Sequence, residues 1–210
     1  MDFLAVLLFA LAVSTDGFMV GVAYGIKKIR VPMLSLAVIA LASASAVTVS
    51  MVCGQGLAAF FSESVSSSIG ALLLIAIGVF FLGRAVREGL SQVNGNSNEL
   101  LTLKVRPLGI IIKILKEPSS ADLDSSGEIS PRESFFLGLA LALDALGAGV
   151  GVAMAGFNIP LTALCVGGLK LVLINLGFMI AATISNKYVK NVSSVLPGII
   201  FILIGIGRFI

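Results

Sequence analysis

Long apolar runs with almost no charge alternate along this chain with short polar or basic clusters. A bilayer span requires about 20 predominantly apolar residues. Six stretches reach that length, and a break containing glycine and proline separates the fourth from the fifth. The pattern predicts an all-α polytopic membrane protein with six transmembrane helices, at residues 3–26, 33–59, 66–86, 134–156, 160–185 and 193–210.

The lysines and arginines predict how these helices cross the membrane. Basic residues gather in three of the connections and are missing from the connections near Glu63 and Phe157. Cytoplasmic loops carry the excess of lysine and arginine in membrane proteins. We therefore expect both termini outside the cell, and Arg208 alone departs from the pattern. The connections expected in the cytoplasm are residues 27–32, 84–133 and 187–192.

Composition narrows the class of protein further. The chain has 210 residues, of which 58% are hydrophobic and 12% charged, so the lipid bilayer is the expected main partner and nucleic acid is not. There is no histidine, which excludes histidine-based catalysis and histidine metal ligands. Cys53 and Cys165 lie inside apolar segments and indicate no disulfide framework.

The two halves of the chain resemble each other. A shift of 128 residues superimposes Gly21 on Gly149 and Pro32 on Pro160. Because each half contains three helices, an odd number, the halves must insert in opposite senses, which predicts two inverted three-helix repeats. The expected parts are a first repeat at 1–88, a cytoplasmic loop at 89–133 and a second repeat at 134–210.

The same shift superimposes two aspartates that lie inside the apolar segments. Asp16 is eleven residues before Lys27, and Asp144 is eleven residues after Glu133. At about 1.5 Å per residue, each lies about 16 Å from the cytoplasmic boundary, near the middle of the bilayer core. A carboxylate at that depth indicates a functional site. We expect the two to form one ion-binding site between the repeats.

Lys170 is also expected near mid-membrane, and Asn175 follows a turn and a half later. A lone lysine there would be costly, so we expect it to pair with Asp16 or Asp144. Two interpretations remain open: a fixed ion pair that holds helices together, or a tethered counter-charge that leaves when a cation arrives. Thr48 offers a hydroxyl ligand from the second helix, although hydroxyls in such helices often bond their own backbone.

The cytoplasmic loop contains the sequence DLDSSGEISPRE, at residues 122–133. Its spacing matches a calcium-binding loop of the EF-hand type, with the turn glycine at Gly127. The predicted Ca²⁺ ligands are Asp122, Asp124, Ser126, Glu128 through its carbonyl, Ser130 and Glu133. The final four residues also read as a capping box that begins the next helix, so helix initiation alone explains them equally well.

Four segments resemble one group of membrane proteins: ALAVSTDGFMVGVAYG, LGLALALDALGAGVGVAMAG, LGRAVREG and ALCVGGLKLVLINLG. Together they resemble the YtaF sporulation membrane protein family, which is similar to the MntP manganese efflux pumps of the lysine-exporter superfamily. The resemblance covers nearly the whole chain and implies a multi-pass transporter of the bacterial cell membrane. The paired membrane aspartates of the pumps carry over to Asp16 and Asp144.

The chain departs from the pumps at two places. The pumps have an acidic residue in their second helix, where this chain reads ALASASAVTVS, and a neutral residue where this chain has Lys170. The resemblance to the pumps implies manganese as substrate, whereas the sporulation family implies a membrane role in spore formers.

The leading hypothesis is therefore secondary transport: efflux of a divalent, manganese-like cation, exchanged for protons and regulated by calcium. The alternative is a non-transporting sporulation protein or calcium-sensing scaffold built on a transporter fold. No enzyme activity is expected, since the GxGD signature of intramembrane aspartyl proteases is missing around both aspartates. Amino-acid export is a further substrate class, and homo-oligomer formation is left open.

Overall fold

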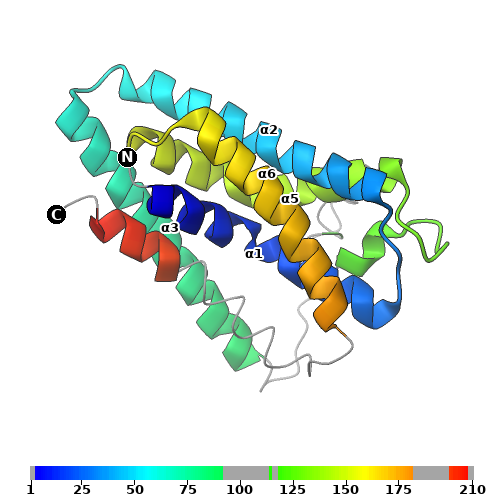
Figure 1. Ribbon diagram of the computed structural model, residues 1–210. Coiled ribbons are helices and arrows are strands. Elements are labelled where there is room, and N and C mark those ends of the chain that lie inside the picture. The colour runs from blue at the N-terminus through cyan, green and yellow to red at the C-terminus, as the bar shows by residue number, and fades with distance from the viewer. Residues whose placement is uncertain (1–2, 92–113, 115–117, 182–198, 208–210) are drawn as a thin grey trace, which may run out of the picture.

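The computed structural model describes residues 3–91, 114, 118–181 and 199–207. Within these ranges all the regular elements are helices, joined by short loops (Figure 1). The helices are α1 (Phe3–Lys27), α2 (Met33–Ala58), α3 (Glu63–Ser91), a short 3₁₀ turn η1 (Pro118–Ala121), α5 (Pro131–Met154) and α6 (Ile159–Ile180). Residues 199–207 form one more helix, here called the 199–207 helix.

Four of these helices are long and apolar enough to cross a membrane: α1, α2, α3 over Ser64–Val86, and α6. Helix α5 bends by 48° between Pro131–Leu143 and Ala145–Met154, and counts as a fifth span when its two parts are taken together. The first five predicted helices thus agree with the structure to within a few residues. Much of the sixth, predicted at 193–210, lies outside the described residues, as does most of the loop at 89–133.

Local signals in the sequence explain where several helices begin and end. Ser130 and Glu133 form the predicted capping box at the start of α5, with Pro131 in the first turn. The side chain of Asn158 accepts a hydrogen bond from the Leu161 N–H and so caps α6. Helix α1 ends at Lys27, and the next residue, Lys28, has a φ of 57° in the left-handed region.

The helices pair across the two halves of the chain. Helix α1 packs along α6, and α2 packs along α5, while α2 also contacts α6 and α3 contacts α5 (Figure 1). Both main pairs are parallel. Gly17 and Gly21 lie against Lys170 and Ile174, in the same order along α1 and α6. Gly138 and Gly149 of α5 meet Ile39 and Ser50 of α2 in the same way.

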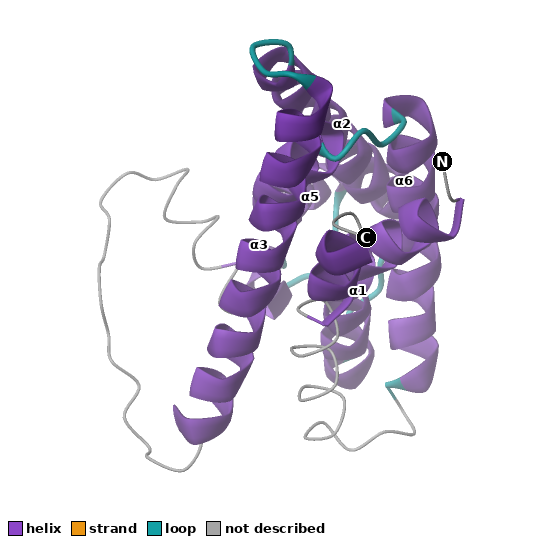
Figure 2. Ribbon diagram, turned by 90° about the vertical axis from the view of Figure 1, so that its left-hand side faces the viewer, coloured by secondary structure: helices purple, strands orange, loops and turns teal. Residues whose placement is uncertain are grey.

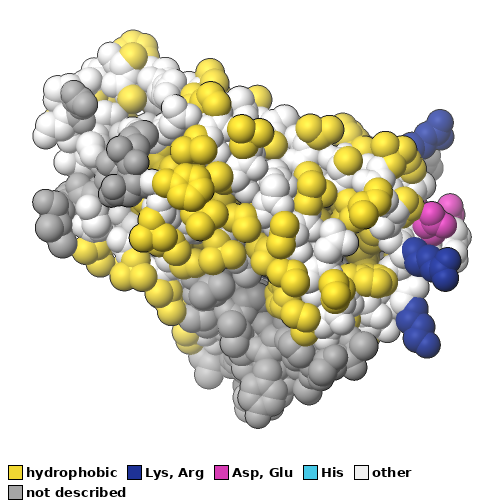
Figure 3. All heavy atoms as spheres, viewed as in Figure 1, with side chains coloured by type: hydrophobic (Ala, Val, Ile, Leu, Met, Phe, Trp, Pro, Cys, Tyr) yellow, Lys and Arg dark blue, Asp and Glu magenta, His cyan; other side chains and the backbone are white. Residues whose placement is uncertain are grey.

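The outer surface of the bundle is largely apolar along its length, as a lipid-facing surface requires (Figure 3). Lys and Arg side chains gather at one end, where the α1–α2 connection meets the loop that precedes α5. We call this the basic end. Towards the opposite end, Phe9 of α1 packs against Phe201 of the 199–207 helix, with ring centroids 5.9 Å apart. Figure 2 shows α3 standing at one side of the bundle.

Candidate functional site

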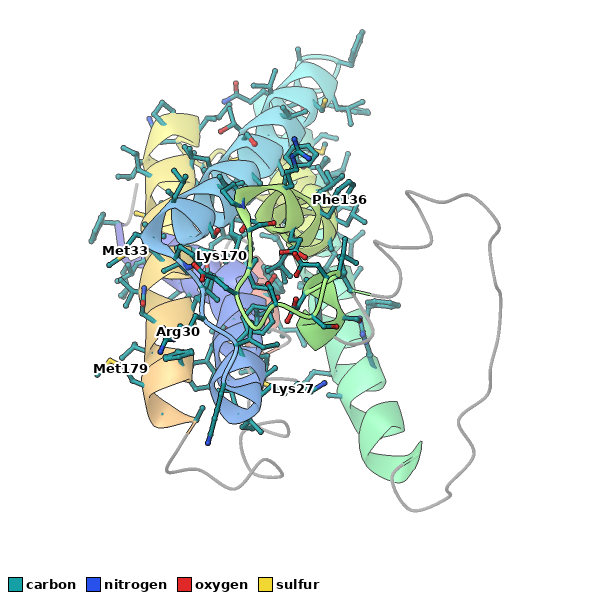
Figure 4. The ribbon with its side chains drawn as sticks, turned by 90° about the vertical axis from the view of Figure 1, so that its right-hand side faces the viewer. Lys27, Arg30, Met33, Phe136, Lys170 and Met179 are labelled. Carbon is teal, nitrogen blue, oxygen red and sulfur yellow. The ribbon has the colours of Figure 1, made fainter. Side chains whose placement is uncertain are left out.

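An ion pair joins α1 to α6 inside the bundle. The Nζ atom of Lys170 lies 2.5 Å from Oδ1 of Asp16, across 154 residues of sequence. The Lys170 side chain is fully buried, and the Asp16 side chain is 21% exposed. Viewed from the basic end, Lys170 lies near the centre of the bundle (Figure 4). The predicted pairing of this lysine with a membrane aspartate is therefore found, and Asp16 is the partner.

Glycine at position 17 makes room for this pair. A Cβ atom there would lie 2.8 Å from Cδ of Lys170 and 3.2 Å from Cγ1 of Ile174. The aliphatic part of the lysine therefore passes directly over the Gly17 backbone on its way to Asp16. The N–H of Gly17 also donates a hydrogen bond of 2.7 Å to Asp16 Oδ1, so one residue both admits the lysine and orients the carboxylate.

Not every buried polar atom of the bundle has a hydrogen-bond partner. Among the described residues, two buried side-chain oxygens have no hydrogen-bond partner: Oδ2 of Asp16 and Oγ of Ser43. Ser43 is fully buried, on the stretch of α2 that contacts both α5 and α6. Buried polar atoms without partners are rare in native proteins and call for an explanation. A cation site would have a carboxylate oxygen available to the ion, and Oδ2 of Asp16 is such an oxygen.

The second predicted aspartate, Asp144, lies where α5 bends. The residues one turn before and after it, Ala140 and Ala148, are each 1% exposed, so both are buried in the bundle. Helix α5 also contacts α1, which carries Asp16. The Asp144 side chain lies outside what the structure describes, so its predicted approach to Asp16 stays a prediction.

The two neutral ligands predicted from sequence occupy different surroundings. The hydroxyl of Thr48 donates to the carbonyl of Ala44 in its own helix, 2.8 Å away, which is the backbone bonding common in membrane helices. Asn175 lies towards the basic end from Lys170, and its Nδ2 donates to the carbonyl of Leu171. No described contact joins Thr48 or Asn175 to the Asp16–Lys170 pair.

The predicted calcium loop closes on itself at the start of α5. Carboxylate oxygens of Asp122, Asp124 and Glu133 all lie within 4.8 Å of one another. Calcium binds oxygen at 2.3–2.6 Å, so two ligands on opposite sides of one ion are about 5 Å apart. The three carboxylates therefore fit around a single Ca²⁺, and the donor set is all oxygen, as this ion prefers.

The other predicted ligands also belong to this loop. Gly127 adopts a φ of 77° at the turn position, and its N–H donates to Asp122 Oδ2. Ser126 donates to the carbonyl of Glu128, while Ser130 donates to Glu133 Oε2. Hydrogen bonds from the Ser126 side chain and backbone N–H hold the pKa of Asp124 below its ordinary value.

The calcium loop is docked onto the connection between α1 and α2. The Arg30 N–H donates to the carbonyl of Gly127, and the Ile129 N–H donates to the carbonyl of Arg30, which forms a short parallel β-bridge. Ser35 of α2 donates to the Ile129 carbonyl over 2.6 Å. The Ile129 side chain is fully buried, in a cluster with Tyr24 and Leu137. One acidic loop thus contacts α1, α2 and α5.

Sequence reasoning missed two parts of this arrangement. The role of Gly17 beneath Lys170 was hidden because glycine spacing alone indicates only close helix packing. The docking of Ile129 on Arg30 joins residues 99 apart in the chain. Its only signal was the apolar residue at the eighth position of the loop.

Comparison with known proteins identifies the family. A family model described as "Putative manganese efflux pump" matches residues 1–82 and 103–209. The chain belongs to the MntP family. It is therefore a multi-pass protein of the cell membrane, in a family of transporters rather than an enzyme class. No solved structure matches it significantly.

Individual relatives agree over nearly the whole length. "Probable sporulation protein YtaF" of Bacillus subtilis is 36% identical over 209 residues, covering 99% of this chain and all of the relative. "Putative manganese efflux pump MntP" of Clostridium perfringens is 27% identical, covering 98% of this chain and 93% of the relative. The Pseudomonas syringae protein of that name is 24% identical. The predicted membership of the YtaF and MntP group is confirmed.

Proposed function

We propose that this protein is a secondary transporter that exports a divalent, manganese-like cation by alternating access. The observation that carries the proposal is the buried pair of Asp16 and Lys170, with one Asp16 oxygen left free. Ionisable side chains buried within a membrane bundle mark ion pathways far more often than they serve packing alone. The description of the family as manganese efflux pumps gives the same substrate class.

The proposed ion site combines Asp16 with Asp144. Both aspartates are expected at the same depth, and their helices α1 and α5 are in contact. Two carboxylates with a hydroxyl oxygen from Thr48, and the amide oxygen of Asn175 on the way to them, would offer the all-oxygen ligands that hard divalent cations prefer. When no metal is bound, protons or Lys170 would neutralise the carboxylates. Exchange of the cation for protons follows naturally from this arrangement.

An inverted repeat would create such a shared site, and the helix pairing supports one. Suppose that the two halves are related by symmetry, with α1 corresponding to α5 and α2 to α6. The contact of α1 with α6 in one direction of this relation then corresponds to the contact of α5 with α2. The contact of α3 with α5 then becomes the contact of the 199–207 helix with α1. These matched, parallel pairs are those expected from a two-fold axis in the membrane plane, with the third helix of each half packed on the opposite half.

Lys170 acts, in this proposal, as a tethered cation that holds the site between transport events. Its ammonium group compensates Asp16 in the low-dielectric interior, where an unpaired charge would be costly. An arriving divalent ion would repel the ammonium group and compete with it for the same carboxylate. The lysine would then leave Asp16 as the metal binds, and return once the metal has departed.

We further propose that the loop at 122–133 binds Ca²⁺ and regulates transport. The fit of three carboxylates around one ion supports binding. Regulation is suggested by the loop's position, because Glu133 lies in the first turn of α5 while Ile129 is seated beside α1 and α2. An ion that stiffens this loop would bias the angle of α5, the helix that carries Asp144.

The alternative is a sporulation membrane protein that does not transport. One observation favours it: Lys170 already neutralises the charge of Asp16, and α2 has no carboxylate that could replace Asp16 as a cation ligand. In this case the ion pair would be a permanent structural link between α1 and α6. The relative from Bacillus subtilis carries a sporulation name rather than a transport name.

Metal flux through reconstituted vesicles and metal resistance of cells without their own manganese exporter test the proposal. We expect Asp16→Asn and Asp144→Asn each to abolish Mn²⁺ flux and resistance while the protein remains in the membrane. Ser45→Ala is the matched control, because this exposed hydroxyl bonds only its own helix. Full flux in both aspartate variants would contradict the proposed site. Absence of flux for every tested ion in the wild-type protein would favour the alternative.

A further inference from the structure

A cavity of about 420 Å³ lies at the basic end, between α1, α6, the α1–α2 connection and the calcium loop. The residues lining it include Gly21 of α1, Ile174 and Asn175 of α6, Arg30 and Glu128. The cavity thus brings one acidic, one basic and one amide side chain together at the end of the bundle where the charged residues gather (Figure 3).

The inner wall of this cavity is about one and a half helical turns from the ion pair. Gly21 is five residues after Asp16 on α1, and Asn175 is five residues after Lys170 on α6. Five residues of helix rise about 7.5 Å. Because α1 and α6 are parallel and in contact at Gly21 and Ile174, both walls reach the pair at the same depth. The cavity therefore lies on the basic-end side of the ion pair, about 7.5 Å from it along the helices.

Glu128 and Asn175, two of the oxygen-bearing side chains that line the cavity, are each held there by a backbone contact. Glu128 belongs to the β-bridge with Arg30, so its side chain stays at the cavity while its carbonyl faces the calcium loop. Asn175 donates its Nδ2 to Leu171, which leaves Oδ1 as the atom available to a ligand. A carboxylate and an amide oxygen are both ligands that suit a hard cation, which could contact them one after the other.

We propose that this cavity is the cytoplasmic vestibule of the transport site, with Glu128 receiving the divalent cation and Asn175 passing it to Asp16. The inference rests on the proposed transport function and adds the route by which the ion arrives. Arg30, on the same wall, weakens the attraction that Glu128 exerts. Removing the charge of Glu128 should therefore weaken cation capture, and removing the charge of Arg30 should strengthen it.

Accessibility of a cysteine at position 175 tests the route without relying on transport. In a background with Cys53 and Cys165 replaced by serine, Asn175→Cys should react with a charged, membrane-impermeant thiol reagent added to the cytoplasmic face. Mn²⁺ should slow that reaction. Leu176→Cys is the matched control: its side chain is 41% exposed on the outer surface and does not line the cavity, so lipid should shield it. Reaction from the opposite face only, or no reaction, would overturn the vestibule.

Kinetics of the charge variants give a second readout. Glu128→Gln should raise the KM for Mn²⁺ roughly tenfold at low ionic strength with kcat unchanged, and the difference should shrink as salt is added. Arg30→Gln should lower the KM. Glu128 offers only its backbone carbonyl to calcium, so Glu128→Gln should still bind Ca²⁺. An unchanged KM in both variants, with Asp16→Asn inactive, would reject the vestibule while leaving the transport function in place.

Discussion

A methyl group on Gly17 would lie 2.8 Å from Cδ of Lys170, closer than real side chains approach. The absence of a side chain on α1 is therefore what lets a lysine from α6 reach across to Asp16. Four residues later, Gly21 lies so close to α6 that an added Cβ would overlap the carbonyl of Ile174. The two glycines accommodate different neighbours, a flexible side chain at one position and backbone at the other.

Alanine substitutions should separate these two roles. Gly17→Ala crowds side-chain atoms of Lys170 and Ile174 rather than backbone, so we expect a smaller loss of stability than for Gly21→Ala, together with altered cation affinity. Gly21→Ala forces α1 from α6 and should cost about 1–3 kcal/mol. Thermal unfolding of purified protein in detergent measures the difference. Gly168→Ala is the control, since no atom lies within 4 Å of its added Cβ. Equal melting temperatures for Gly17→Ala and Gly21→Ala would contradict this distinction.

Removing one member of the ion pair should be worse than removing both. Lys170→Met leaves the Asp16 carboxylate without its cation, and loss of one partner from a buried pair typically costs about 3–5 kcal/mol. The double variant Asp16→Asn with Lys170→Met should recover much of that stability, because no uncompensated charge remains. A double-mutant cycle on melting temperature measures the coupling. Additive losses would mean that the two side chains do not interact energetically.

The calcium loop can be tested without disturbing the helix that it precedes. Glu133→Gln keeps a side chain able to complete the capping box with Ser130, but removes a charged metal ligand. We expect it to weaken Ca²⁺ binding strongly while α5 still forms. Isothermal titration calorimetry on the purified wild-type protein and the variant measures this. If the wild-type protein binds no Ca²⁺ at millimolar concentrations, helix initiation is the loop's whole role.

Docking of the calcium loop should depend on Ile129. This side chain is fully buried, so Ile129→Ala should cost about 2–4 kcal/mol locally and loosen the loop from Arg30. Limited proteolysis between residues 118 and 130 should become faster. Leu123→Ala, in the same loop but 49% exposed, should leave the cleavage rate unchanged. Equal cleavage of both variants would show that Ile129 does not hold the loop.

Much of this architecture could be predicted from the sequence. Charge-free length gave the first five helices, and the isolation of Asp16 and Lys170 in apolar surroundings indicated a pair, because a lone charge is unfavourable there. The prediction could not choose between Asp16 and Asp144 as the partner of Lys170. That choice depends on the small residue at Gly17 and on the parallel contact of α1 with α6. The four-residue spacing of the glycines indicates close packing but does not say which helix packs there.

The hydroxyl ligands were harder to predict for a similar reason. Thr48 and Ser43 lie on the same helix and look alike in sequence, yet Thr48 bonds its own backbone and Ser43 has no described partner. Which of them is left free is decided by the neighbouring helices. The cavity beside Glu128 was equally invisible, since it is formed by three stretches far apart in the chain, at residues 21–36, 128 and 174–178.

Helices of the first half pair with helices of the second half, and this also constrains how the protein is assembled. In the described residues α1, α2 and α3 make almost no direct contact with one another, and each rests on a helix made later. The first three helices to leave the ribosome therefore find most of their tertiary partners only after α5 and α6 have been made. Neither half should be stable when produced alone in the cell, and the two halves produced together as separate chains should stabilise each other.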